Sequence, residues 1–532
     1  MTDKVTPFTD TAAEYESLLT TGQELRHSLD PAGAVSYCER TGEFLGRVYD
    51  SELSAPKRAD LLLIRAELSL TLGKWDEAAR DLDEVIAFTV VRIKYEPLVH
   101  ALLGRGEIEG FRGNAEAALD YIETGLALAA EHYDKEWTLV GRIRQGGLYS
   151  RLGWHQEAAN LLASCHPLVD EMAQEDPDKG IRLRASLFCQ EGLCAFRDGD
   201  LEKAGEFYEH SKDLFRKRSG GMPIIAEELA ETHRYYGVVC SLNGEYKEAL
   251  ENYREALRIY KKRGNPFGIA KVYNSIGQMC IALTKLEEAL HFLVKGEKIC
   301  QDLGAVSEAA AIYGKMGQAY MVMEDYQEAV KFFLKDLKLS QKSTNIRALA
   351  HTNRNLGNCY GFIGEPEQAI ASLEDSLRLF SQVQDELQTA GVHQDLSYVY
   401  INEGNLGQAE VHAQEAHKIF EKHDRAADDA YTRILIAVIL RHRKQYNEAL
   451  PLFEGEIEVL KAREPGFHLV EAYYQFGLLS LNLEDHEKAL EQFRKGYTIA
   501  KSLGLHKQAE RNFKMIERMD ELEIVNLLLE GA

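Results

Sequence analysis

Residues 277–289 read GQMCIALTKLEEA, and variants of this stretch recur at 317–329 as GQAYMVMEDYQEA and at 357–369 as GNCYGFIGEPEQA. Each copy begins with a glycine and ends with an alanine twelve residues later. The alanine follows a turn residue, a variable pair, and acidic or amide residues. Successive copies are 40 residues apart, and a fixed period of this length is the signature of a repeat array.

The alanine recurs eleven times, at intervals of 40, 40, 46 and 45 residues and then six times at 40. These residues are Ala78, Ala118, Ala158, Ala204, Ala249, Ala289, Ala329, Ala369, Ala409, Ala449 and Ala489. A small residue stands twelve positions before each: Ala66, Gly106, Gly146, Gly192, Gly237, Gly277, Gly317, Gly357, Ser397, Ala437 and Gly477. A repeat array grows by adding neighbours, so the length of 532 residues does not imply several globular domains.

Each repeat is predicted to be two helices, A and B, joined by a tight turn. Apolar residues recur at steps of three and four, as at Ala289, Leu290 and Leu293, which is the spacing of one helix face. The small residues are expected where the two helix backbones come closest, because a larger side chain would force the axes apart. A bulky residue four positions after the alanine fills the adjoining gap, and only Ala413 departs from that rule.

This pattern resembles the tetratricopeptide repeat (TPR) family, whose signature is a small residue at position eight, alanine at position twenty and a bulky residue at position twenty-four. The resemblance covers residues 59–500, nearly the whole sequence. It implies an all-α fold, a right-handed α-solenoid of antiparallel helix pairs with 11–12 repeats. HEAT arrays have a similar period, but the twelve-residue interval and the turn favour the TPR family.

The usual TPR unit is about 34 residues long, so the helices here are lengthened. The 40-residue period is similar to that of the Leu-Gly-Asn repeat scaffold proteins, and residues 353–360, NRNLGNCY, resemble helix A of that subgroup. Bacterial quorum-peptide-sensing response regulators and the sensor arms of some large transcription activators also use lengthened repeats of this type.

Two longer intervals mark insertions, one near Pro167 and Pro177 and one at residues 216–223. The predicted organisation is a degenerate N-terminal helical pair or cap (1–50), three repeats (51–165), a repeat with irregular flanking loops (166–224), regular 40-residue repeats (225–503) and C-terminal capping helices (504–532). The apolar run at 524–529 is expected to complete the cap; docking onto the array or onto a partner stays open.

The net charge of −23, from 62 basic and 85 acidic residues, disfavours nucleic acid and anionic membranes as partners. No stretch approaches the ~18 apolar residues of a membrane span, and the N-terminus lacks the pattern of a secretory signal. The eight cysteines are scattered singly, without a CxxC pair. Such usage is typical of a reducing compartment, so we expect a cytoplasmic protein.

The sequence contains none of the motifs GxxxxGK[ST], HExxH and GxSxG. His417 and His423 are six residues apart, so they project roughly 240° apart around a helix and do not converge on a metal. We therefore predict a protein that is not an enzyme and that takes no metal or cofactor.

In the TPR family the A helices line the concave surface, and residues three before and one after the small residue project into it. The resemblance thus implies a peptide-binding groove made of Arg234, Asn274, Gln278, Gln318, Arg354, Asn358, Gln394, Tyr398 and Asn402. Amides both donate and accept hydrogen bonds, and an arginine fork grips a carboxylate. An acidic peptide or the C-terminus of a polypeptide, extended or helical, is the expected guest; a merely solvated face is the alternative.

At the same helix phase other repeats carry apolar residues, namely Leu63, Leu103, Ile434, Val438, Tyr474 and Leu478. These predict grooves for an amphipathic helix or for the protein's own terminal helix. The expected function is a protein–protein interaction scaffold. The alternative is a peptide- or metabolite-responsive sensor that changes pitch at the two insertions and acts through a separate effector. Self-association through an exposed end or groove also stays open.

Overall fold

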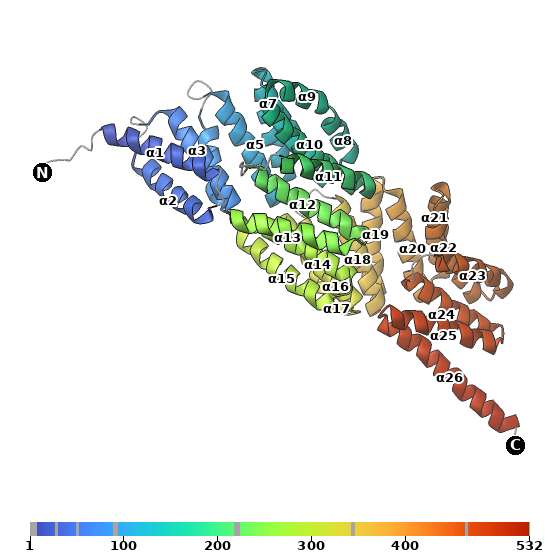
Figure 1. Cartoon of the computed structure of the whole chain (residues 1–532). Helices are drawn as coiled ribbons and strands as arrows, with labels where there is room; N and C mark the ends of the chain where they lie inside the picture. Colours follow the sequence, from blue (N-terminus) through green and yellow to red (C-terminus); the bar gives the residue numbers. More distant parts are fainter. Residues whose placement is uncertain are drawn as a thin grey trace. The chain divides into compact units, whose positions relative to one another are not determined.

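The computed structural model describes residues 8–26, 30–48, 53–88, 94–217, 224–341, 346–462 and 466–530. The described residues form helices and turns and contain no strand (Figure 1). The chain divides into two compact units. The first unit is Met1–Ala319 with Lys335–Asn345, and the second unit is Tyr320–Leu334 with Ile346–Ala532. The division falls within α16 (Val306–Val322) and α17 (Tyr326–Ser340).

The remaining helices lie wholly in one unit. Those of the first unit are α1 (Phe8–Arg26), α2 (Pro31–Arg47), α3 (Ala55–Thr71), α4 (Trp75–Ile86), α5 (Tyr95–Arg112), α6 (Ala115–Glu131), α7 (Lys135–Leu152), α8 (His155–Ala163), α9 (His166–Glu175), α10 (Pro177–Asp198), α11 (Leu201–Lys217), α12 (Ile224–Leu242), α13 (Tyr246–Arg263), α14 (Pro266–Ala282) and α15 (Leu286–Leu303). Those of the second unit are α18 (Ile346–Ile363), α19 (Pro366–Gln382), α20 (Glu386–Asn402), α21 (Leu406–Lys422), α22 (Ala426–His442), α23 (Tyr446–Lys461), α24 (Phe467–Asn482), α25 (His486–Ser502) and α26 (His506–Glu530).

Within each unit the most extensive helix contacts join the two helices of one repeat, as in α5 with α6, α14 with α15, α18 with α19 and α24 with α25. Each pair also contacts the next pair along the sequence, as α13 contacts α14 and α19 contacts α20. Nearest-neighbour stacking of this kind defines a solenoid. The predicted all-α fold of stacked helix pairs is therefore confirmed.

The small residues and the alanines meet as the repeat pattern requires. All eleven motif alanines are fully buried. A Cβ placed on Gly357 would lie 2.5 Å from Leu373 Cγ and 3.0 Å from the Ala369 carbonyl oxygen. Where serine replaces glycine, the Ser397 hydroxyl donates a hydrogen bond of 2.9 Å to the Ala409 carbonyl. Helices A and B therefore approach too closely for a larger side chain at the small-residue position.

The turn between helices A and B uses a left-handed backbone in every repeat. The residue five positions before each motif alanine has a positive φ, and in seven of the eleven repeats it is glycine. The exceptions are Thr284, Glu324, Lys444 and Glu484, with φ between 56° and 65°. A β-branched residue such as Thr284 is strained most in this region.

We expect Thr284→Gly to stabilise the pair α14–α15 by roughly 0.5–1 kcal/mol, because relief of left-handed strain exceeds the added conformational entropy of glycine. Amide hydrogen exchange of the two helices should slow accordingly. The reverse change, Gly364→Thr, is the control, since a Cβ there meets nothing within 4 Å and only backbone strain remains. It should speed exchange in α18–α19, and a change of the same sign at both positions would contradict the strain argument.

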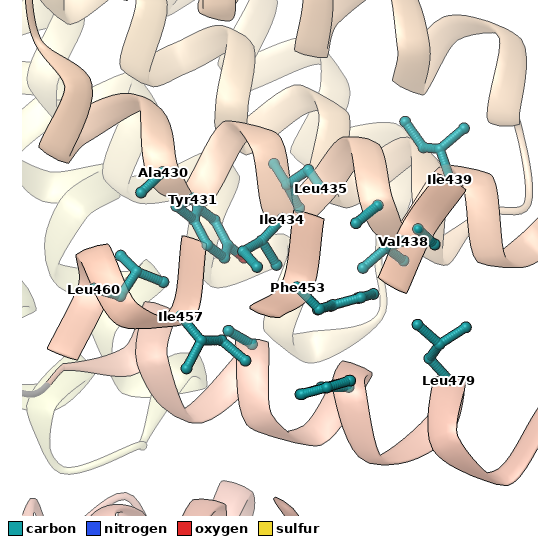
Figure 2. Packing of buried hydrophobic residues seen from close by; sticks show 14 of the residues in the cluster. Ala430, Tyr431, Ile434, Leu435, Val438, Ile439, Phe453, Ile457, Leu460 and Leu479 are labelled. Carbon is teal, nitrogen blue, oxygen red and sulfur yellow. The ribbon is translucent and has the colours of Figure 1, made fainter. Parts of the chain in front are cut away.

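The bulky residues after the alanines fill the core. Figure 2 shows Phe453 and Ile457 of α23 close to Ile434 and Val438 of α22. The ring of Phe453 stacks on Phe476 of α24 at a centroid distance of 5.5 Å, which ties one repeat to the next.

The first insertion forms the extra helix α9. Pro167 lies in the first turn of α9 and Pro177 begins α10, positions where the missing proline N–H costs no helix hydrogen bond. Of the second insertion, at residues 216–223, the first two residues end α11 and residues 218–223 lie outside the described residues. At the C-terminal end, the structure has one continuous helix, α26, where the sequence predicted successive capping helices.

An aromatic trio joins distant repeats of the first unit. The ring of Trp75 lies 5.5 Å from Phe111 and 5.0 Å from Phe267, and Phe111 and Phe267 are 4.9 Å apart between centroids. Trp75 is 3% exposed although it stands at the first turn of α4. We call this trio the first clasp.

A second clasp, of Tyr326, Phe362 and Phe467, occurs within the second unit. The ring of Phe362 is 4.7 Å from that of Tyr326 and 5.6 Å from that of Phe467. Counted back from their motif alanines, the three residues hold the same repeat positions as Trp75, Phe111 and Phe267. Equivalent positions therefore make equivalent long-range contacts in both units.

All eight cysteines are buried as free thiols. Of the helices that the structure describes, none combines the length and the apolar character needed to cross a membrane.

Candidate peptide-binding site

The candidate site consists of the A-helix side chains at the predicted groove positions. In the first unit these come from α12, α14 and α16, and in the second unit from α18 and α20.

Arg234 of α12 is the centre of a closed ion network in the first unit. Its guanidinium donates to both carboxylate oxygens of Glu231, at 2.9 and 3.1 Å. The same carboxylate accepts from Lys271 Nζ at 2.8 Å and from the Tyr260 hydroxyl at 2.8 Å. Burial would raise the pKa of Glu231, but the two cations outweigh it and hold that pKa far below its usual range. Arg234 is 8% exposed, so its fork already holds an internal carboxylate.

The amide positions of the first unit are more open. Asn274 donates to Glu308 at 2.8 Å, while its side-chain oxygen is buried and has no hydrogen-bond donor among the described residues. Gln278 and Gln318 are half-buried. Gln318 accepts a hydrogen bond of 3.3 Å from Lys315, whose pKa is lowered by burial.

In the second unit Arg354 and Asn358 converge on one carboxylate of the next A helix. Arg354 Nε lies 2.5 Å from Asp395 Oδ2, and the Asn358 amide donates to the same oxygen at 3.2 Å. Arg354 also donates to Gln388 at 3.2 Å. Burial would lower the pKa of Arg354, but Asp395 reverses the effect and raises it. This arginine, like Arg234, has its charge matched inside the fold.

The α20 positions differ in exposure. The Gln394 amide is buried and donates to the Asp428 carbonyl at 3.0 Å and to the Thr432 hydroxyl at 2.7 Å. The Tyr398 ring meets Phe467 of the second clasp edge-on, with centroids 6.2 Å apart. Asn402 is exposed.

The predicted positions thus separate into two kinds. Arg234, Arg354 and Gln394 are committed to internal partners, which only the folded protein reveals. Gln278 and Gln318 are half-buried and Asn402 is exposed, while Asn358 is half-buried and bonded to Asp395.

Most of the residues predicted to line apolar grooves are buried in the core instead. Leu63, Leu103, Ile434 and Val438 are at most 7% exposed, so they belong to the core. The prediction was wrong there because a position that projects inward in one repeat is covered by its neighbours in another. Tyr474 and Leu478 pack against a cluster of Ala489, Phe493, Ile516 and Met519, the last two of which belong to α26. The protein's own terminal helix therefore covers that apolar surface.

One polar residue near the helix phase of the predicted groove was not predicted. Arg441 lies in the last turn of α22, four positions after Ala437. It follows Ile434 by seven residues, so the two side chains project within about 20° of each other around the helix. It departs from the apolar residues that most repeats carry at this position, and that departure is the sequence signal that could have found it.

Cys240, Glu245 and Glu248 are the one group of three potential metal ligands among the described residues, with donor atoms within 4.8 Å of one another. Burial and the two carboxylates raise the pKa of the Cys240 thiol to about 12. This shift favours the protonated thiol, whereas metals bind the thiolate.

Comparisons with known proteins agree with the repeat analysis. Tetratricopeptide repeat profiles match residues 228–302, 308–382 and 470–513. No curated protein sequence matches this one.

Among solved structures, the apo form of RapI is similar, with 14% identity, a TM-score of 0.53, and coverage of 69% of this chain and 98% of RapI. The quorum sensor NprR from B. thuringiensis in its apo form has 17% identity and a TM-score of 0.49, over 65% of this chain and 97% of NprR. A Rap protein complexed with competence and sporulation factor has 11% identity and a TM-score of 0.46, over 73% of this chain and 98% of that protein. At these identities the likeness to RapI concerns the fold alone. The repeat period, the buried small-residue contacts and the matching repeat profiles together identify the molecule as a tetratricopeptide repeat protein.

Proposed function

We propose that this protein is a non-enzymatic scaffold that binds a peptide or a helix of a partner protein along its A helices. The observation that carries the proposal is the pair of half-buried amides Gln278 and Gln318 in the first unit, at one helix phase and 40 residues apart. An amide offers a donor and an acceptor and so matches the backbone of a bound segment. The buried free thiols fit a cytoplasmic setting.

Gln278→Ala/Gln318→Ala tests the proposal on an immobilised library of random short peptides. We expect the double variant to bind the peptides that the wild type selects about thirtyfold more weakly, since each lost amide pairing is worth about 1 kcal/mol. Gln156→Ala/Gln301→Ala is the matched control, because both of these glutamines are exposed on B helices. Equal losses in the two double variants, or none in either, would argue against a groove on the A helices.

A second candidate is a peptide- or metabolite-responsive regulator that acts through a separate effector. It is supported by the inserted helix α9, which interrupts the regular stacking of the first unit. Small-angle scattering before and after saturation with a selected peptide separates the two functions. A scaffold keeps its dimensions, whereas a regulator of this kind changes them.

A further inference from the structure

Arg441 is a half-buried arginine whose charge the described residues leave unmatched. Six other described arginines have a clearly raised pKa because a carboxylate lies beside the guanidinium. Where burial would lower the pKa, the carboxylate outweighs it. These residues are Arg65, Arg105, Arg234, Arg354, Arg443 and Arg511. The pKa of Arg441 is lowered instead, by burial, and only Tyr474 and Tyr446 oppose that effect. In the described part of the sequence no carboxylate forms an ion pair with Arg441.

The partners of Arg441 are all neutral. Its Nη2 lies 2.9 Å from Nε2 of His442 and 3.2 Å from the side-chain oxygen of Gln475, and its Nη1 lies 3.5 Å from that of Asn482. Its Nε is buried and has no hydrogen-bond acceptor among the described residues. The longest contact is the one at Nη1, so this nitrogen is the donor most available to a ligand.

The carboxylate that Gln475 contacts, that of Glu471, is already occupied. Glu471 is 2% exposed and accepts from Arg511 at 2.5 Å through one oxygen and from the Gln475 amide at 2.8 Å through the other. Gln475 thus separates Arg441 from Glu471, donating to the carboxylate and accepting from the guanidinium. The negative charge of Glu471 is balanced by Arg511, and the positive charge of Arg441 remains.

The guanidinium is nevertheless reachable. Arg441 and Gln475 are half-buried, while His442 and Asn482 on either side are exposed. The C-terminal end of α22 supplies at most about half a negative charge, so the helix dipole does not neutralise the arginine. A half-buried cation without an anion destabilises a fold. The protein as a whole carries a net charge of −23, so an unmatched positive charge is contrary to its overall charge.

We propose that Arg441, with Asn482 and His442 at its rim, is a receptor for a single carboxylate of the bound segment, either an acidic side chain or a free C-terminus. The inference rests on the proposed function and names the chemistry of its partner. One unmatched positive charge fits a monoanion, and the planar fork of arginine fits a carboxylate. A dianionic phosphate would leave a negative charge uncompensated beside Glu471.

The test uses the full-length protein and resin-bound libraries of random short peptides attached through their N-termini. One library carries free carboxyl ends and all residue types; a second is amidated; a third is amidated and has Asn and Gln in place of Asp and Glu. We expect the wild type to retain acidic or free-carboxyl peptides about tenfold better than wholly neutral ones, as one charge-assisted hydrogen bond predicts. Arg441→Gln should abolish this preference and leave the binding of neutral peptides unchanged.

Arg443→Gln is the matched control. It removes the same charge only two residues from Arg441, but the Arg443 guanidinium is already paired with Glu410. This variant should keep the preference. An unchanged preference in Arg441→Gln, or no preference in the wild type while neutral peptides bind, overturns the inference and leaves the proposed function standing. Failure of the wild type to bind any library overturns both. If Arg441→Gln does not fold, Arg441→Lys decides: because lysine keeps the charge but lacks the planar fork, the preference should weaken, and an unchanged preference refutes the carboxylate receptor.

Discussion

Trp75→Ala is expected to destabilise the first unit by about 3–5 kcal/mol, the usual cost of emptying a buried tryptophan site. The effect should appear in two places far apart in the sequence. The indole packs on both Phe111 and Phe267, so its removal uncouples α4 and α5 from the start of α14. Amide hydrogen exchange measured by mass spectrometry should therefore speed up in all three helices, because local opening free energies set these rates.

Trp154→Ala is the control, because Trp154 is 45% exposed and makes its ring contact only with the nearby Tyr149 among the described rings. Its cost should stay within about 1 kcal/mol. Faster exchange confined to α4 and α5 in Trp75→Ala would show that the first clasp does not couple distant repeats.

Glu231→Gln should cost about 3 kcal/mol, because removal of one member of a buried ion network leaves the others uncompensated. Arg234 and Lys271 both lose their counter-ion, and the Tyr260 hydroxyl loses a charged acceptor. The expected readout is faster exchange across α12, α13 and α14. Glu255→Gln in α13 is the control, since Glu255 and Arg258 form a solvent-exposed pair, and it should change stability by less than about 1 kcal/mol.

The pH dependence of the same network follows from the direction of the pKa shift. The folded-state pKa of Glu231 is depressed, so its contribution is fully present above the ordinary glutamate pKa of about 4.3. That contribution is lost as the pH falls from there through the folded-state value. Wild type and Glu231→Gln should therefore differ in stability by the full amount at pH 7 and converge only in strong acid; a constant difference down to that range would contradict the assignment.

The repeat sequence was sufficient to predict how neighbouring helices pack. The twelve-residue interval placed Gly277 and Gly357 against the following helix, and Cβ atoms at both would clash with Leu293 and Leu373. This succeeded because the constraint is local: one turn and one helix crossing fix which residues meet. The amide positions of the groove stay a prediction that the peptide libraries test.

The sequence did not reveal which of the arginines near the predicted groove phase lacks a carboxylate partner in the described part of the chain. Arg354 was expected to grip a guest, yet Asp395 from the next repeat holds it, while Arg441 stands four positions beyond a small residue and was not expected in the groove at all. The partner of an arginine depends on which side chains of the next helix lie opposite it along the helix axis. Periodicity does not encode that choice, since each repeat varies at these positions.

The amino-acid sequence by itself determined the helix pairs, the turns between them and the close contacts between small residues, because these are set by residues within one repeat of each other. The tertiary structure alone decided that Trp75 contacts Phe267 and that Glu471 pairs with Arg511 and not with Arg441. Such contacts depend on the small rotation that every repeat adds to the last. Those rotations accumulate over several repeats, and no single stretch of sequence specifies their sum.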